Sequence, residues 1–392
     1  MTTPISFRAL FDQAITPETD GSTGRFRAPK DLKTTDADND RDALSSFLNE
    51  YTKTPTTRRA YEKECERLLY WAVLQRGTAL SSMARDDFME YMKFMGKPDG
   101  DWCGKKAPRN TPAWRPFTGG LSKSAQLTAI ACINSFLSWL VDVGYTSVNP
   151  LGSMRQLRKD TVKADTSTKV NRFLDDVMWD SFTKAIEDLP RESSLDEFRY
   201  QRAKFMAIML SMIGPRVSEL AAARMNSFRD DGYGWFWKTL GKGSKLADVS
   251  VPPDMLDALI AWRRFLGLTT LPSSADMTPL LPAVDKAGTP RLSEFEEGIQ
   301  PRRINQILDG LFESAAKSIV EKYPDKADKL RRASAHWGRH TAITQKINAG
   351  MDKELVRKDA RHSDARTTDH YIHDDENART SEAKKHRLKW SP

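Results

Sequence analysis

The chain has 392 residues, a net charge of +8 and an isoelectric point near 9.2. This length exceeds what one hydrophobic core ordinarily supports, so we expect two or three domains. The N-terminus lacks the pattern of a signal peptide, and we expect no apolar stretch of the roughly 20 residues that a membrane span needs. Three cysteines, an odd number and widely spaced, argue against a disulfide framework and favour the cytoplasm. The basic charge favours a polyanionic partner but does not prove one.

The N-terminal half of the chain reads as a tail followed by a small helical domain. Residues 1–40 are rich in Thr, Asp, Gly and Pro and are predicted to be a flexible tail. Apolar residues then recur at helical spacing in three places, at about 55–76, 83–94 and 122–143. Thr54 is a potential cap for the first of these helices, and Gly144 ends the third. We interpret 41–150 as an all-helical domain.

The remaining chain begins with a charged segment, 151–168, that is predicted to be a linker between domains. Residues 169–380 are again mostly helical, with one exception. Two short aromatic and β-branched runs, 235–240 and 247–251, flank Gly241-Lys242-Gly243-Ser244 and predict a β-hairpin. Residues 381–392 are assigned to a C-terminal tail. The predicted fold is therefore mainly α, with a small antiparallel β-hairpin or sheet in the larger domain.

A candidate phosphate-binding group lies at a predicted helix break. An apolar helix ends at Gly214-Pro215, and a new helix starts with Arg216 in its first turn. Free amide groups at a helix N-terminus attract phosphate, and an arginine fork can hold two phosphate oxygens. The alternative is an ordinary surface arginine paired with Glu219, which lies three residues on. The segment alone does not decide between them.

The tip of the predicted hairpin carries a second candidate, Lys242, between two glycines. Glycines allow a tight turn and a close approach to a ligand, and a lysine there could donate a proton. Lys245 competes for this role, and a solvated turn lysine is the other interpretation.

All six histidines lie in the C-terminal part of the chain, at 336, 340, 362, 370, 373 and 386. His336 and Arg339 are three residues apart and share one helix face. A metal site is the rival interpretation because His336 and His340 are four apart, but Trp337 stands where the HExxH motif requires glutamate. We interpret His340 as a packing residue, and the last three histidines as incidental.

Nine residues separate His362 from Tyr371, in a polar segment that also holds arginines and further histidines. Either residue alone would be an ordinary surface or core group. Such a segment is a poor place for packing, however, and a nucleophilic tyrosine needs cationic neighbours or a base because its pKa is near 10.

Taken together, these groups resemble the tyrosine recombinase (phage integrase) family. The family's order of groups is matched by Arg216 in GPRVSEL, Lys242 in GKGSK, His336 and Arg339 in SAHWGRHT, His362 in ARHSD, and Tyr371. The chain departs from the family in having Pro215 and Gly338 where leucine is more frequent, and Arg361 where glycine is frequent. The stretch between Lys242 and His336 also looks longer than usual, which suggests an insertion around 285–330.

The resemblance implies a reaction at a DNA phosphodiester. Tyr371 would attack the phosphorus, giving a 3′-phosphotyrosyl link and a free 5′-hydroxyl. Arg216 and Arg339 would bind the non-bridging oxygens as negative charge develops. Lys242 would protonate the leaving 5′-oxygen, and His336 would take or hold the tyrosine proton.

The resemblance further implies that His362 hydrogen-bonds the phosphate. It also implies that the reaction needs no metal, no other cofactor and no ATP. It implies double-stranded DNA as partner, a tetramer assembled on paired DNA sites, and no membrane. The domain at 41–150 is similar to the family's core-DNA-binding domain. Its basic loop, 96–120, offers four candidate phosphate contacts, Lys105, Lys106, Arg109 and Arg115.

The sequence therefore predicts a site-specific recombinase, such as the integrase of a mobile element. Two other classes stay open: a protein that keeps this fold but only binds DNA, and a metal-dependent nuclease. The first predicts no covalent adduct with DNA, and the second predicts that a chelator abolishes cleavage.

Overall fold

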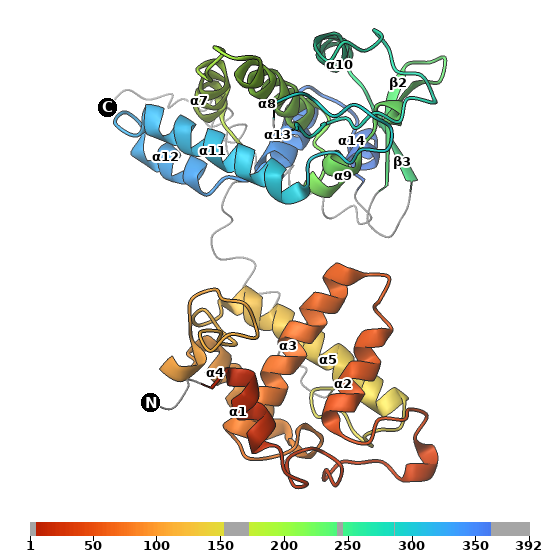
Figure 1. The fold of residues 1–392 in the computed structure, drawn as a ribbon, viewed down its shortest axis with the longest axis vertical. Helices are drawn as coiled ribbons and strands as arrows, with labels where there is room; N and C mark the ends of the chain where they lie inside the picture. The colour runs from red at the N-terminus through yellow and green to blue at the C-terminus, as the bar shows by residue number, and fades with distance from the viewer. Residues whose placement is uncertain (1–4, 153–171, 241–245, 286, 362–392) are drawn as a thin grey trace, which may run out of the picture. The chain divides into compact units, whose positions relative to one another are not determined.

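The chain folds into two compact units, Met1–Lys169 and Val170–Pro392 (Figure 1). This computed structural model describes residues 5–152, 172–240, 246–285 and 287–361. Each unit has its own hydrophobic core. Both units are mainly helical, and a three-stranded antiparallel sheet lies in the second. The predicted fold class is confirmed, whereas the predicted linker, 151–168, lies almost wholly outside the described residues.

The first unit is a bundle of helices joined by short 3₁₀ turns. Its helices are α1 (Phe7–Ala14), α2 (Asp40–Asn49), α3 (Pro55–Leu74), α4 (Arg85–Gly96) and α5 (Lys123–Asp142), and its turns are η1 (Lys30–Leu32), η2 (Leu80–Ser82) and η3 (Gly100–Trp102). The three helices predicted by periodicity are confirmed. Thr54 occupies the N-cap position of α3 as predicted, but its side chain makes no capping hydrogen bond and its hydroxyl donates to the carbonyl of Tyr51 instead (3.4 Å). Ser122 caps α5 by accepting a hydrogen bond from the amide of Ala125 (3.3 Å).

Helix α5 is also long and apolar enough to cross a membrane by length and composition, with a mean hydropathy of 1.4. The expectation that the chain holds no such stretch overlooked this helix. Its buried residues include Ile133, Phe136 and Leu140, which belong to the core of the first unit. Length and mean hydropathy alone therefore do not distinguish a buried core helix from a membrane-spanning helix.

The structure differs from the predicted flexible tail at 1–40. From residue 5 onward the segment is described, and it packs onto the first unit. Phe7 and Phe11 of α1 are 5% and 2% exposed, and both rings contact the ring of Tyr70 on α3. At the other end, the buried carboxylate of Asp40 accepts a hydrogen bond from the hydroxyl of Tyr145 (2.9 Å). The segment is therefore attached at both ends, and its average composition conceals the two aromatic residues that pack on α3.

The second unit contains the sheet and the remaining helices. Its elements are α7 (Asp176–Glu187), α8 (Ser194–Met212), α9 (Val217–Ala222), η4 (Met225–Ser227), β1 (Phe228–Asp230), β2 (Trp235–Leu240), β3 (Leu246–Ser250), α10 (Pro253–Phe265), α11 (Pro301–Ile319), α12 (Pro324–Arg331), α13 (Ala335–Asn348) and α14 (Lys353–Ala360). Figure 1 shows α11 and α12 side by side, and both pack against α7. Helix α13 packs against α8, and α14 lies beside β3.

The sheet has the order β1-β2-β3, with antiparallel pairs throughout. The register aligns Phe228, Trp237 and Val249 in one row across the three strands, and all three side chains are buried. One face of the sheet is therefore anchored in the core by this row. The predicted hairpin is confirmed in its two strands, whereas its turn, 241–245, lies outside the described residues.

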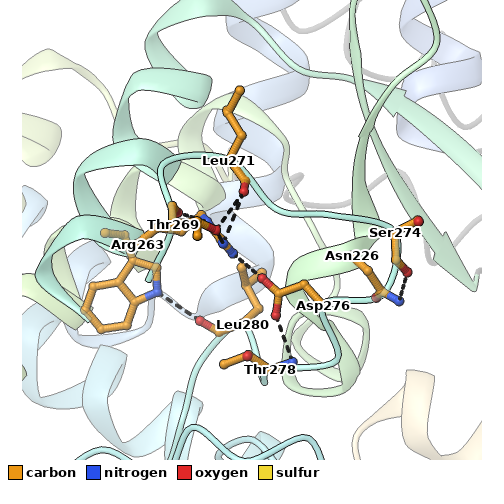
Figure 2. A network of polar contacts seen from close by, with 9 residues as sticks. Asn226, Arg263, Thr269, Leu271, Ser274, Asp276, Thr278 and Leu280 are labelled. Atoms are coloured by element: carbon orange, nitrogen blue, oxygen red, sulfur yellow. Dashed lines mark hydrogen bonds and ion pairs between the residues drawn. The ribbon is translucent and has the colours of Figure 1, made fainter. Parts of the chain in front are cut away.

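The segment between α10 and α11 has no regular helix and is held by a buried ion pair (Figure 2). The guanidinium of Arg263 is 1% exposed, pairs with Asp276 (2.7 Å) and donates to the carbonyl of Thr269 (2.8 Å). Burial alone would raise the pKa of Asp276, but hydrogen bonds from Arg263 and Thr278 hold that pKa below its ordinary value. Residues 285–330, where the sequence suggested an insertion, include α11 and α12, and both helices contribute to the core of the second unit. The insertion itself stays a prediction.

Candidate active site

The candidate site begins at the sharp turn between α8 and α9. Gly214 has φ of 64°, and a Cβ at this position would lie 3.2 Å from Cβ of Ala342 and 3.4 Å from Cα of Arg339. Glycine adopts this left-handed conformation without strain, and it also allows the turn to approach α13 closely. Pro215 then prevents α8 from continuing. The turn thus brings Arg216 to the side of α13.

Arg216 is the N-cap residue of α9, with helix geometry beginning at Val217. The carboxylate of Glu219 accepts from the backbone amide of Arg216 (2.8 Å) and pairs with its guanidinium (2.7 Å). The pair predicted from the sequence therefore forms. The amide of Arg216, however, is occupied by Glu219 instead of being open to phosphate, in the manner of a capping box. The side chain of Glu219 is 3% exposed and that of Arg216 is 34% exposed, so the arginine reaches solvent.

Arg339 joins α13 to this turn and to the end of α14. The residue is 2% exposed, and its Nη1 donates to the carbonyl of Gly214 (2.7 Å) while Nη2 donates to the carbonyl of Ala360. A guanidinium carries five N–H groups, so these two bonds do not by themselves exhaust its donors. A phosphate that binds Arg339 must nevertheless enter a site that is closed to water in this structure.

Arg361 directly follows α14, at a position where glycine is frequent in the family that the chain resembles. Its φ is 55°, and its Nη2 pairs with Glu219 (3.0 Å) and donates to the carbonyl of Gly214 (3.3 Å). The guanidinium also lies over the ring of Trp237, 5.6 Å from the centroid. Glu219 is therefore shared by two arginines, one from each end of the second unit's sequence.

His336 lies one turn before Arg339 on α13, as the spacing predicts, and its side chain is exposed. Partial desolvation lowers the pKa of His336 below 6.5, and the positive charges of Arg339, Arg172 and Arg216 lower it further. His336 is therefore neutral at neutral pH and able to accept a proton. The ring of His340 lies edge-on to it, with 4.5 Å between the centroids.

Three of the predicted site residues lie outside the described part of the chain: Lys242, His362 and Tyr371. Lys245, the competitor of Lys242, lies outside it as well. Their positions in the site stay predictions. The described residues bring together Arg216, His336 and Arg339, and they add two groups, Glu219 and Arg361.

No family model matches the chain. Two curated proteins are similar to it over most of their length. The chain is 25% identical over 259 residues to tyrosine recombinase XerC of Thermodesulfovibrio yellowstonii, covering 65% of this chain and 73% of the relative. It is 23% identical over 317 residues to a tyrosine recombinase of Thermosipho africanus, covering 81% and 88%. These relatives support the resemblance to the tyrosine recombinase family.

Solved structures of a recombinase and an integrase share the fold of this chain. The XerH site-specific recombinase, in a post-cleavage complex with palindromic difH substrate, has a TM-score of 0.58 and 14% identity, covering 88% of this chain and 84% of that chain. The Tn1549 transposon integrase, in complex with transposon right-end DNA, has a TM-score of 0.53 and 16% identity, covering 88% and 98%.

One departure of this chain from the pattern of the tyrosine recombinases has a packing reason. A Cβ at Gly338 would lie 3.1 Å from Cβ of Leu210, so α13 and α8 are in close contact here. The leucine that is more frequent at this position would force the helices apart. Gly338 therefore sets how closely Arg339 approaches the turn after α8.

The basic loop of the first unit is only partly available for DNA. Arg109 pairs with Glu66 (2.8 Å), and Arg115 donates to the carbonyls of Pro112 (2.7 Å) and Trp114 (2.8 Å). Lys105 and Lys106 are exposed. Of the four predicted phosphate contacts, the two lysines are the most accessible.

Proposed function

We propose that this chain is a site-specific DNA recombinase that cleaves and rejoins DNA through a 3′-phosphotyrosyl intermediate, integrating or excising a mobile element. The observation that carries the proposal is the gathering of Arg216, His336 and Arg339. Arg339 and the turn that precedes Arg216 are 125 residues apart in sequence and are joined by one hydrogen bond. Two guanidinium groups suit the charge of an anionic phosphodiester, and a neutral histidine beside them can accept the proton that the attacking hydroxyl loses.

The chemistry assigns one role to each group. The Tyr371 oxygen bonds to phosphorus as the bond from phosphorus to the 5′-oxygen breaks. The phenol proton passes to His336, and Lys242 gives a proton to the leaving 5′-oxygen. Arg216 and Arg339 oppose the charge that develops on the non-bridging oxygens, and each such donor is typically worth about 2.7–4 kcal/mol in the transition state. The covalent link conserves the phosphodiester bond energy, so rejoining needs no ATP.

The partner is double-stranded DNA, bound by both units, and the active form is a tetramer on paired DNA sites. The DNA partner is supported by a solved structure of similar fold, the λ integrase at a TM-score of 0.51, which is described as a dimer bound to a core site. The tetramer rests on the resemblance to the family. We assign 41–150 to core-site binding and 169–380 to catalysis. His362 completes the phosphate contacts.

The decisive experiment is covalent trapping on DNA. Duplexes that bind the full chain are selected from a random library and rebuilt as nicked suicide substrates, from which the cleaved end is lost. We expect a protein–DNA adduct that survives denaturation, that Tyr371→Phe abolishes and that EDTA leaves unchanged. Binding without a Tyr371-dependent adduct would favour a purely architectural protein, and cleavage abolished by EDTA would favour a metal-dependent nuclease.

A further inference from the structure

Arg361 has an unusual backbone for its residue type. Among the residues that the structure describes, it is the one non-glycine with positive φ, at 55°. A side chain with a Cβ is disfavoured in this left-handed region, and helix ends that need it commonly use glycine. The presence of arginine here calls for a compensating contact of its side chain.

The side chain makes that contact inside the protein. It is 4% exposed and pairs with Glu219, which is 3% exposed. The buried ring of Trp237 covers one side of the guanidinium. Nε and Nη1 of Arg361 are buried without a hydrogen-bond partner among the described residues. A buried charge with unmet donors is costly, so packing alone does not explain the residue.

Arg361 shares its acceptors with both arginines of the candidate site. Glu219 binds Arg216 through one oxygen (2.7 Å) and Arg361 through the other (3.0 Å). The carbonyl of Gly214 accepts from Arg339 (2.7 Å) and from Arg361 (3.3 Å). Arg361 thus contacts an acceptor of each of the two arginines. The guanidinium groups of Arg216, Arg339 and Arg361 together carry more positive charge than the carboxylate of Glu219 neutralises.

The backbone next to Arg361 is held independently of its side chain. Asp359 accepts from the hydroxyl of Ser250 (2.9 Å) and pairs with Lys346 (2.6 Å), which ties α14 to β3 and α13. The carbonyl of Ala360 accepts from Arg339. Removal of the Arg361 side chain therefore leaves the end of α14 attached, so the role of the side chain can be tested separately.

We infer that Arg361 is a positioning residue for DNA cleavage: it fixes Glu219 and the Gly214 carbonyl so that Arg216 and Arg339 oppose the same phosphate. This inference rests on the proposed recombinase function. A glycine at this position would end α14 without strain but would provide no side chain to hold Arg216 and Arg339, which explains why arginine stands here.

The test is single-turnover cleavage of the nicked suicide substrate at saturating DNA by the full chain. Arg361→Gly, which relieves the backbone, is expected to slow adduct formation at least tenfold while the Kd for DNA changes less than about twofold. Arg361→Lys, which keeps the charge near Glu219, should restore part of the rate. Arg331→Ala, at an exposed arginine of α12 paired with Asp328, serves as the control and should match the wild type.

A second substrate separates positioning from folding. A methylphosphonate at the scissile position removes the charge that the arginines oppose, so the difference between Arg361→Gly and the wild type should shrink. Wild-type rates for Arg361→Gly, or a loss that follows its Tm or its DNA affinity, would overturn the inference while leaving the recombinase function intact. Failure of the wild type to form a Tyr371-dependent adduct would overturn both.

Discussion

Gly338 gives the sharpest test of how closely α13 must pack. We consider Gly338→Ala, which adds one methyl group 3.1 Å from Cβ of Leu210. Carbon atoms in contact prefer about 3.5–4.0 Å, so the helices must separate by a few tenths of an ångström. Overpacking of this kind typically costs about 1–3 kcal/mol. Replacement of glycine by alanine in a helix otherwise gains up to about 1 kcal/mol. The free energy of unfolding should therefore be unchanged or fall by up to about 2 kcal/mol.

The matched control is Gly310→Ala on α11, where an added Cβ meets nothing within 4 Å. This substitution should stabilise the second unit by about 0.8–1 kcal/mol, the intrinsic preference for alanine. Both variants are compared by urea unfolding and by adduct formation. Because Gly338 directly precedes Arg339, we expect slower cleavage for Gly338→Ala alone. Equal stabilisation by the two substitutions would refute the close contact between α13 and α8.

Three further expectations concern protonation, the buried ion pair and DNA binding. The cleavage rate should fall as the pH drops below 6.5 and passes the lowered pKa of His336, because the protonated ring cannot accept a proton. Because the charge of Arg172 lowers this pKa, Arg172→Ala should shift the fall in rate to higher pH. Arg263→Met should destabilise the chain by about 1–3 kcal/mol in urea unfolding, because the partly buried carboxylate of Asp276 loses its countercharge and the carbonyl of Thr269 loses a donor. An unchanged free energy of unfolding would contradict this. In salt titrations of DNA binding, Lys105→Ala with Lys106→Ala should reduce the slope of log K against log salt by about 1.8, and an unchanged slope would remove both lysines from the interface.

Much of the architecture is predictable from local patterns in the sequence. Helical spacing of apolar residues located α3, α4 and α5 within a few residues, and β-branched and aromatic runs located β2 and β3. Helix α1 was missed because its buried face consists of Phe7 and Phe11, too short a pattern to stand out in a polar segment. The other end of the segment is attached through Asp40, whose partners Ser81 and Tyr145 are far away in the sequence and are encoded by no local pattern.

The candidate site was predictable in its residue types but not in its connections. The spacing of His336 and Arg339 follows from helix geometry, and so does the pair of Arg216 with Glu219. Nothing in the sequence indicates that Arg361 returns to the same carboxylate across 142 residues, since that contact depends on how α14 packs on β3. The burial of Arg339 could not be predicted either, because it results from the packing of α13 against the turn at Gly214 and the end of α14.

The shared carbonyl of Gly214 also has a consequence for the order in which the protein is made. Its two donors, Arg339 and Arg361, belong to the last part of the described chain, whereas the turn itself is synthesised far earlier. A nascent chain that has released α8 and α9 from the ribosome still lacks every group that orders this turn from the C-terminal side. A chain truncated before α14 would keep Arg216 and Glu219 but lose Arg361 and the Ala360 acceptor of Arg339. The contacts that join Arg216, Arg339 and Arg361 can therefore form only after residue 361 has been synthesised.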